Sequence, residues 1–216
     1  MNTSFRQYGH FMRDNTVYIV GAGGHGRVIR DALVETAGSD GTPFISSFVD
    51  DNGPHLSPEE LPNGPCTQVI VGIGDNFMRE KMVDRLKSSG KSLIFVSAHH
   101  PVAFVSHGTE VGEGVAIFAK AVVQPGVQLG DFCIVNTSAT VDHDCKIGRF
   151  AHVAPGVNLC GNVTVGDRTL VGVGSCAIPG VDIGSDTIIG AGSVIVSDIP
   201  SGVVAHGNPC RVVKEL

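Results

Sequence analysis

The chain has 216 residues, of which 42% are hydrophobic and only 6% aromatic, and its formal net charge is −6. This length allows one or two domains, and the acidic balance argues against a general electrostatic surface for nucleic acid. No apolar run reaches the roughly 18 residues that a membrane span needs, and the six cysteines lack the spacing of a disulfide framework. We therefore expect a cytoplasmic protein with reduced thiols.

The first half of the sequence predicts a small α/β domain. Residues 1–15 are polar and irregular, and we expect an irregular extension there. Residues 16–98 then alternate short apolar runs, typical of strands, with helical patterns; the strands are expected at 16–20, 44–49, 67–71 and 92–96, and the helices at 27–36 and 77–88. This alternation is typical of a Rossmann-like βαβαβ unit with a parallel sheet. The pattern changes near residue 99, where we place the domain boundary.

A glycine-rich loop follows the first predicted strand. Gly21, Gly23 and Gly26 form the pattern G-x-G-x-x-G, in which backbone N–H groups and a helix N-terminus can hold a diphosphate. A nicotinamide dinucleotide normally needs two such halves, whereas fewer than about 90 residues form only one. The sequence therefore favours a nucleotide diphosphate carrying another group over NAD, with a ligand-free glycine turn as the structural alternative. His25 lies within this loop, and Gly74 belongs to a loop at the same sheet edge.

The second half of the sequence, residues 99–216, has a strict six-residue repeat. Every sixth residue from Val105 to Ile195 is aliphatic, without an insertion. A period of six fits neither an α-helix nor a flat strand, and it is typical of a parallel β-helix, in which each repeat forms one side of a coil. Cys133 and Cys145 occupy the small inward position of the repeat, so we expect them in the core.

Two histidines of the repeat are candidates for chemistry. His143 stands between Asp142 and Asp144, on an outward-facing wall or corner. A neighbouring carboxylate favours the protonated imidazole and so increases the basicity of the ring, which a general base needs. His152 follows half an 18-residue coil later, so the two histidines need not share a face. The alternative for both is an inert surface histidine.

A zinc site of the kind found in some β-helix proteins would need three histidines that converge around an open position. The candidates are His107, His143 and His152, which occupy different phases of the repeat. This arrangement does not predict a metal site.

Several motifs together resemble those of the left-handed β-helix acetyltransferases that carry an amino-terminal nucleotide-sugar domain. The resemblance extends from Val17 to Val212 and is strongest to the bacillosamine-pathway N-acetyltransferases and to sialic acid O-acetyltransferases. The motifs are the Gly-Ala-Gly-Gly-His-Gly loop (21–26), Ile-Gly-Asp-Asn (73–76), Asn-Thr-Ser (136–138), Val-Asp-His-Asp-Cys (141–145), Cys-Gly-Asn-Val-Thr-Val-Gly (160–166) and Gly-Asn-Pro-Cys-Arg (207–211).

The resemblance implies a role for each matching residue. His143 would be the general base and Asp144 its acid partner, where relatives often have Glu; Asp142 is a second candidate for that task. The acetyl-CoA positions would be His152, Gly161, Val173 and Ala191. The nucleotide-sugar positions would be Gly23, Gly24, His25, Asp50, Asp51, Gly74 and Asn136.

The resemblance also implies the activity and the assembly. We expect an acetyl-CoA-dependent N-acetyltransferase that acts on a nucleotide-linked amino-deoxysugar, foremost a UDP-4-amino sugar used for cell-surface glycans or glycoproteins. It needs no metal, and it would form a homotrimer with active sites between subunits. The alternatives are O-acetylation of sialic acid or another sugar, and a non-catalytic β-helix scaffold that binds a nucleotide.

Overall fold

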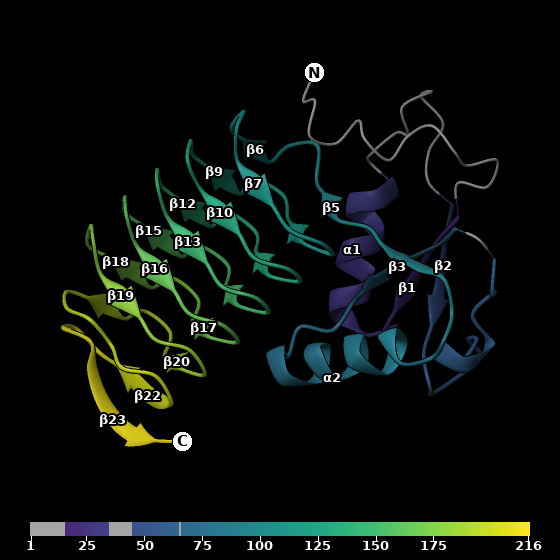
Figure 1. Cartoon of the computed structure of the whole chain (residues 1–216). Coiled ribbons are helices and arrows are strands. Elements are labelled where there is room, and N and C mark those ends of the chain that lie inside the picture. Colours follow the sequence, from purple (N-terminus) through teal and green to yellow (C-terminus); the bar gives the residue numbers. More distant parts are fainter. Residues whose placement is uncertain (1–15, 35–44, 65) are drawn as a thin grey trace.

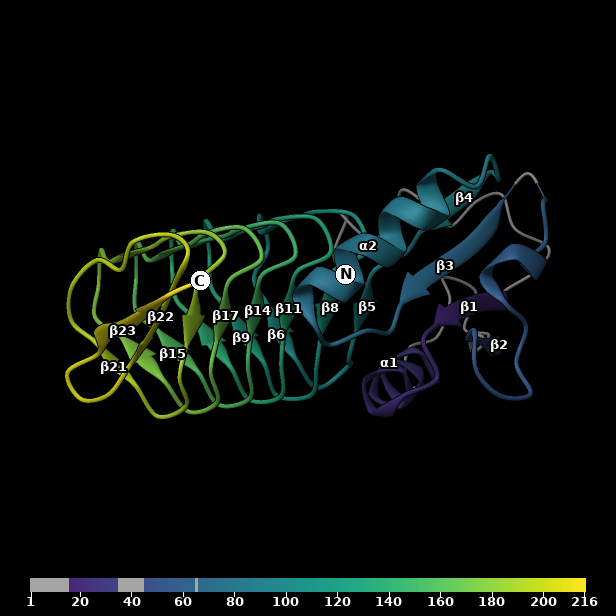
Figure 2. The same ribbon diagram turned by 90° about the horizontal axis from the view of Figure 1, so that it is seen from below.

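The computed structural model describes residues 16–34, 45–64 and 66–216. The expected extension at 1–15, the end of the first predicted helix and the first residue of the second predicted strand lie outside these ranges. The described chain consists of a small α/β domain beside a long β-helix (Figures 1 and 2). The predicted fold class, an α/β domain followed by a parallel β-helix, is confirmed.

The α/β domain contains one parallel sheet. Its elements are β1 (Thr16–Val20), α1 (Gly24–Val34), β2 (Ile45–Val49), a 3₁₀ turn (Pro58–Glu60), β3 (Thr67–Val71), α2 (Asn76–Lys87) and β4 (Leu93–Phe95). The strand order is β2-β1-β3-β4. Because β2 lies on one side of β1 and β3 on the other, the loops after β1 and β3 flank the switch point where open α/β sheets bind ligands.

The β-helix is built from two-residue strands that form three parallel faces, and two longer strands, β22 and β23, end the first face. The first face contains β5 (Ala98–His99), β8 (Ala116–Ile117), β11 (Ile134–Val135), β14 (His152–Val153), β17 (Leu170–Val171), β20 (Ile188–Ile189), β22 (Val203–His206) and the antiparallel β23 (Arg211–Glu215). The second contains β6 (Phe104–Val105), β9 (Val122–Val123), β12 (Thr140–Val141), β15 (Asn158–Leu159), β18 (Cys176–Ala177) and β21 (Val194–Ile195). The third contains β7 (Glu110–Val111), β10 (Gln128–Leu129), β13 (Lys146–Ile147), β16 (Thr164–Val165) and β19 (Asp182–Ile183).

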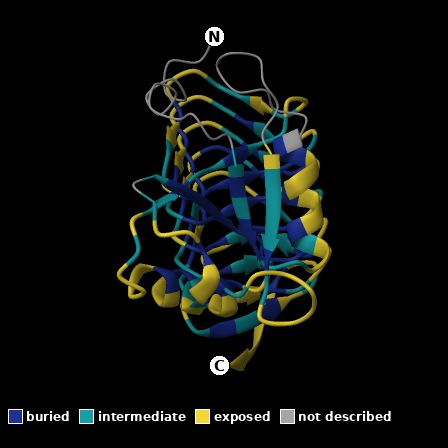
Figure 3. Cartoon of the chain, turned by 90° about the vertical axis from the view of Figure 1, so that its right-hand side faces the viewer, coloured by how far each residue is buried: buried dark blue, intermediate teal, exposed yellow. Residues whose placement is uncertain are grey.

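From β6 to β21, the second residue of each strand belongs to the core column of the coil. Figure 3 shows buried backbone segments recurring along the β-helix. Val141 and Leu159, for example, pair across β12 and β15 and are at most 2% exposed. Cys133 and Cys145 are fully buried in the same column, as the repeat predicts. Burial of an unbroken aliphatic column supplies most of the driving force for stacking the coils.

The turns between faces have a recurring backbone conformation. Every sixth residue from Gly108 to Gly192 has a positive φ. Seven of these fifteen residues are glycine, which adopts this conformation at little cost. The other eight are Lys120, Phe132, Ser138, Asp144, Phe150, Asn162, Arg168 and Asp186.

The α/β domain is seated on the first face and on one corner of the β-helix. Side chains of α1, including Ile29 and Leu33, pack with Ala116 and Ile134 of the first face. Helix α2 lies against the 3–1 corner, formed by the turns 130–133, 148–151 and 166–169, where Phe132 and Phe150 stack with ring centroids 5.1 Å apart. No helix in the described ranges is long and apolar enough to span a bilayer.

Candidate functional site

The glycine loop is tightly packed at Gly26 but open at Gly23 and Gly24. A Cβ atom at Gly26 would overlap Gly21 O, and one at Gly72 would lie 2.7 Å from Gly26 Cα. These contacts press the loops after β1 and β3 against the start of α1. In contrast, a Cβ at Gly23 would have no neighbour within 4 Å, and one at Gly24 would meet only the Arg27 side chain, at 3.8 Å. The helix N-terminus therefore faces open space that suits a phosphate.

This contrast gives a first prediction. Gly26→Ala should destabilise the chain by about 1–3 kcal/mol, because the added methyl group overpacks the loop, whereas Gly23→Leu should leave the free energy of unfolding nearly unchanged. Urea denaturation of both variants measures this difference. Equal loss in the two variants would contradict the packing described for Gly26.

The two predicted acidic residues of the pocket have different surroundings. Asp50 Oδ2 accepts a hydrogen bond from Ala22 N at 2.8 Å and Oδ1 accepts one from Asn52 N at 3.0 Å. These bonds hold the Asp50 pKa below its usual value. Through the bond from Ala22 N, the carboxylate also holds the glycine loop in place. Asp51 instead forms an exposed ion pair with Arg85 of α2, at 2.6 Å, and its pKa is lowered by that bond.

His25 lies at the contact between the glycine loop and the β-helix. Its ring packs edge-on against Phe118, at 5.1 Å between centroids, and against His152, at 6.0 Å. Burial, aided by the charge of Arg79, lowers its pKa to about 4, so the ring is neutral at pH 7. Its Nε2 atom is buried without a hydrogen-bond partner in the described part of the chain. Such an atom is costly unless another molecule satisfies it.

His152 joins the α/β domain to the β-helix. Its Nδ1 lies 3.2 Å from Gly74 O and its Nε2 lies 2.9 Å from Asn136 Nδ2. A carbonyl only accepts, so Nδ1 carries the proton and Nε2 accepts from the Asn136 amide. Burial, Arg79 and His25 lower the His152 pKa to about 4. The ring is therefore a fixed neutral tautomer with both nitrogens engaged.

His143 has the opposite environment. It lies on the 2–3 corner, in the turn between β12 and β13, and its side chain is 55% exposed. Nδ1 lies 2.9 Å from Asp144 Oδ2, while Asp142 Oδ1 accepts from the backbone N of His143 at 2.8 Å. The Asp144 hydrogen bond first, and the charge of Asp142 second, raise the His143 pKa. With Nδ1–H held by Asp144, Nε2 is the atom that can take a proton from another molecule.

Gly161 fixes the other side of this histidine. It occupies the equivalent turn of the next coil, and a Cβ atom there would lie 2.5 Å from His143 Cε1 and 2.6 Å from Nε2. The structure thus places Gly161 against the His143 ring. Only a residue without a side chain leaves the ring in this position.

A second prediction concerns Asp144, which has a φ of 61°. Asparagine tolerates this conformation, so Asp144→Asn should keep the turn while removing the carboxylate that raises the His143 pKa. The pKa of His143 should fall toward its ordinary value, and the neutral ring should persist to lower pH. An NMR titration of the His143 ring measures this shift. An unchanged pKa would show that Asp144 does not control the base.

The predicted site residues therefore fall into separate groups. His25, Gly74, Asn136 and His152 meet where the α/β domain contacts the first face. His143, Asp144 and Gly161 form a second group on the 2–3 corner, which is the corner that does not border the first face. Val173 and Ala191 are exposed at equivalent positions of the 1–2 corner. Asp51 joins none of these groups.

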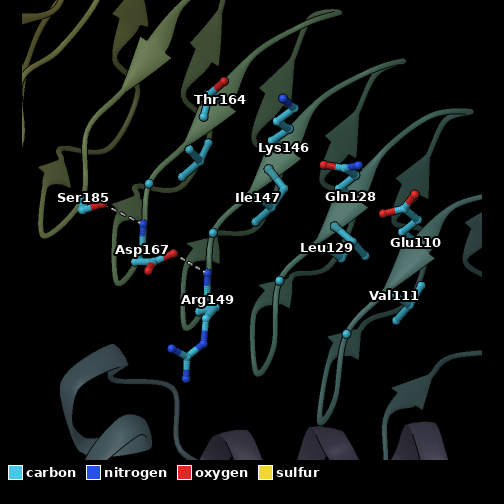
Figure 4. Close-up of a pocket in the computed structure, with 15 residues that line it drawn as sticks. Glu110, Val111, Gln128, Leu129, Lys146, Ile147, Arg149, Thr164, Asp167 and Ser185 are labelled. Atoms are coloured by element: carbon cyan, nitrogen blue, oxygen red, sulfur yellow. Dashed lines mark hydrogen bonds between the residues drawn. The ribbon is translucent and has the colours of Figure 1, made fainter.

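A shallow depression runs along the third face, but no predicted site residue lines it (Figure 4). Glu110, Gln128, Lys146 and Thr164 stand along it on successive strands. Within the described ranges, no group of three or more His, Cys, Asp or Glu side chains is placed to hold a metal ion.

Sequence reasoning missed the residues that join the two domains. Arg79 of α2 is only 2% exposed and lies between the loop after β3 and the 3–1 corner. Arg168 of that corner contacts Glu80 of α2 at 3.3 Å. A signal was available: Phe132, Phe150 and Arg168 are bulky residues, 18 apart, at a turn position where the repeat otherwise favours Gly, Asn or Asp.

Comparisons with known proteins agree with this architecture. Residues 16–86 match the family model described as the PglD N-terminal domain. The chain is 35% identical over 116 residues to UDP-N-acetylbacillosamine N-acetyltransferase of Bacillus subtilis (strain 168); this alignment covers 48% of the chain and 51% of that protein, about half of its length.

Two solved structures are similar over almost the whole chain. The acetyltransferase domain of PglB from Neisseria gonorrhoeae FA1090, in complex with acetyl coenzyme A, is 34% identical with a TM-score of 0.80, covering 93% of this chain and 100% of that one. PerB from Caulobacter crescentus, in complex with CoA and GDP-perosamine, is 38% identical with a TM-score of 0.79, covering 92% and 97%.

Proposed function

Because this chain belongs to the family of left-handed β-helix N-acetyltransferases of nucleotide-linked amino sugars, we propose that it transfers the acetyl group of acetyl-CoA to the amino group of a nucleotide-linked amino-deoxysugar. The observation that carries this proposal is His143, an exposed imidazole whose Nδ1 is held by Asp144 at 2.9 Å and whose Nε2 is left for a substrate. The open helix N-terminus at Gly23 and Gly24 suits the diphosphate of the sugar nucleotide.

The proposed reaction needs one base. The amine nitrogen attacks the thioester carbonyl carbon while His143 Nε2 accepts the amine proton. The new C–N bond forms, the C–S bond breaks, and the thiolate of CoA leaves and takes the proton back from His143. The raised pKa of His143 makes the ring a stronger base for the first transfer. Asp144 orients the ring and stabilises its protonated form.

We further propose that the complete site lies between two subunits of a homotrimer. In one chain, His143 is on the corner away from the first face, whereas the glycine loop, His25 and His152 lie against that face. A neighbouring copy would bring the two groups together. The exposed apolar residues Phe104, Val173, Ile178 and Val196 lie on the second face and beside it, as expected of a buried contact. The third face carries mainly polar side chains.

The nucleotide and the acceptor are tested together. One relative is named for UDP-N-acetylbacillosamine, and the solved structure of another contains GDP-perosamine; we propose a UDP-4-amino sugar as the first substrate. Release of CoA is measured with UDP-, GDP- and dTDP-linked 4-amino-6-deoxysugars, with sialic acid as the O-acetylation control. We expect turnover with one amino-sugar nucleotide and none with sialic acid. Turnover only with sialic acid would overturn the N-acetyltransferase proposal, and no turnover with any acceptor, together with nucleotide binding, would favour a scaffold.

The state of the cysteines and the proposed co-substrate both bear on the cellular compartment. All six cysteines are free, as is usual for proteins of a reducing compartment, and the proposed reaction consumes acetyl-CoA. We therefore propose that the enzyme works in the cytoplasm.

A further inference from the structure

Arg79 is a buried cation whose role the proposed reaction leaves unexplained. Its side chain is among the largest that are fully buried. In the described ranges it forms no ion pair with a carboxylate, although Asp75 is near enough to favour its charge. Burial lowers its pKa to about 10, so the guanidinium stays charged at pH 7. A buried cation without a carboxylate partner is stable only if its N–H groups are well satisfied.

The surroundings of Arg79 meet this need in full. A guanidinium has five N–H donors in a fixed plane, and five acceptors lie within 3.0 Å. Nε donates to Phe132 O (2.9 Å), Nη1 to Ile73 O and Gly74 O (both 3.0 Å), and Nη2 to Asn76 Oδ1 (2.8 Å) and Phe150 O (2.6 Å). The side chain therefore joins the loop after β3, the start of α2 and two successive coils of the β-helix.

One of these acceptors connects Arg79 to the site. Gly74 O accepts from Arg79 Nη1 and also from His152 Nδ1, at 3.2 Å. The His152 ring in turn accepts a hydrogen bond from the Asn136 amide at its Nε2. A continuous series of hydrogen bonds thus runs from Arg79 through Gly74 and His152 to Asn136, across the boundary between the domains.

We propose that Arg79 is a positioning residue, which fixes the Gly74 carbonyl and thereby holds His152 in one orientation and one tautomer beside the glycine loop. The inference rests on the proposed function, since it assigns Arg79 to the same acetyl-transfer site. The alternative is that Arg79 only strengthens the contact between the two domains.

The experiment compares Arg79→Lys with Arg168→Met. Lysine keeps the charge but has three donors on a point-like group, so it cannot reproduce the planar fork. Arg168 also ties α2 to the 3–1 corner, through Glu80, but its side chain bonds only to Glu80 and Asp186 in the described chain and does not reach the loop at 73–74. Met therefore removes a domain contact without touching the Gly74 carbonyl. Arg79→Met serves as a second variant, in which both charge and fork are lost.

Two measurements distinguish a role of Arg79 in positioning His152 from a role in strengthening the contact between the two domains. Nitrogen-15 NMR of the folded proteins at pH 7.5 should show the Nδ1–H tautomer of His152 in the wild type and in Arg168→Met, and a mixture of tautomers in Arg79→Lys. The kcat/KM of Arg79→Lys should fall on the order of 10²-fold, as expected when reacting groups are misplaced by about 1 Å, while Arg168→Met should stay near the wild-type value.

The results for these variants decide whether Arg79 positions His152 or only joins the two domains. A folded Arg79→Lys variant with the wild-type tautomer would overturn the proposal. So would failure of both Arg79 variants to fold beside a folded Arg168→Met, since Arg79 would then serve the fold itself. If the wild type transfers no acetyl group to any acceptor, the proposed function fails, yet the tautomer comparison still tests Arg79.

Discussion

Replacing His143 with alanine should lower kcat on the order of 10²-fold or more, which is the usual contribution of a general base. The imidazole is the only titratable ring on the 2–3 corner of its coil, and its Nδ1 is already bonded to Asp144. Without it, the attacking amine must release its proton to water. Affinity for acetyl-CoA should be unchanged, because the variant removes a proton acceptor and leaves the neighbouring coils intact. Steady-state kinetics and calorimetric titration give the two quantities.

A matched control uses a second exposed histidine of the β-helix. His107 lies in the turn after β6, in the first coil of the same corner. His107→Ala should keep wild-type kcat. Wild-type turnover by the His143 variant would remove the proposed mechanism, and equal losses in both variants would indicate a general effect on the β-helix.

Mixing two chains that are each impaired in a different half of the site should restore activity if the site is shared between subunits. One chain carries His143→Ala, and the other carries Gly23→Leu, which fills the open space over the glycine loop without a packing clash. In a closed ring whose sites each combine two neighbouring subunits, an equal random mixture contains about one quarter of sites with both halves intact. Co-refolded mixtures should therefore reach about a quarter of wild-type turnover, whereas each variant alone stays far below that level.

The mass of the assembly provides the accompanying check. Light scattering should give three times the 22.4 kDa of one chain. A chain that is monomeric at assay concentrations and fully active would exclude the shared site. A trimer without complementation would show that each chain contains its own complete site, which contradicts the separation of His143 from the glycine loop.

The β-helix was predictable from the sequence because its signal is periodic. An aliphatic side chain at every sixth residue, from Val105 to Ile195, specifies the coil directly, and the inward cysteines follow from the same register. His143 and Asp144 were predictable as a pair because they are adjacent in the chain, and adjacent residues remain close in any fold.

Contacts between the domains were not predictable in this way. Arg79 bonds to Phe132 and Phe150, which are 53 and 71 residues away, and it does so through backbone carbonyls that carry no side-chain signal. Likewise, Asp51 has the sequence position of a pocket residue, but its partner Arg85 is 34 residues away. Such pairings depend on how α2 is seated on the corner, which neither composition nor periodicity specifies.

The positive-φ turns of the 3–1 corner exchange local stability for contact with the α/β domain. A residue with a Cβ loses about 1 kcal/mol or more in that conformation compared with glycine, yet Phe132, Phe150 and Arg168 occupy it in three successive coils. At the same corner, the preceding coil has Gly114 and the following coil has Asp186. On this corner, the bulky side chains that adopt this conformation thus lie in the coils that contact the α/β domain. Glycine at these three positions would relieve the strain, but it would also remove the ring packing and the ion pair that join this corner to α2, so local stability of the turns is exchanged for a fixed placement of the α/β domain.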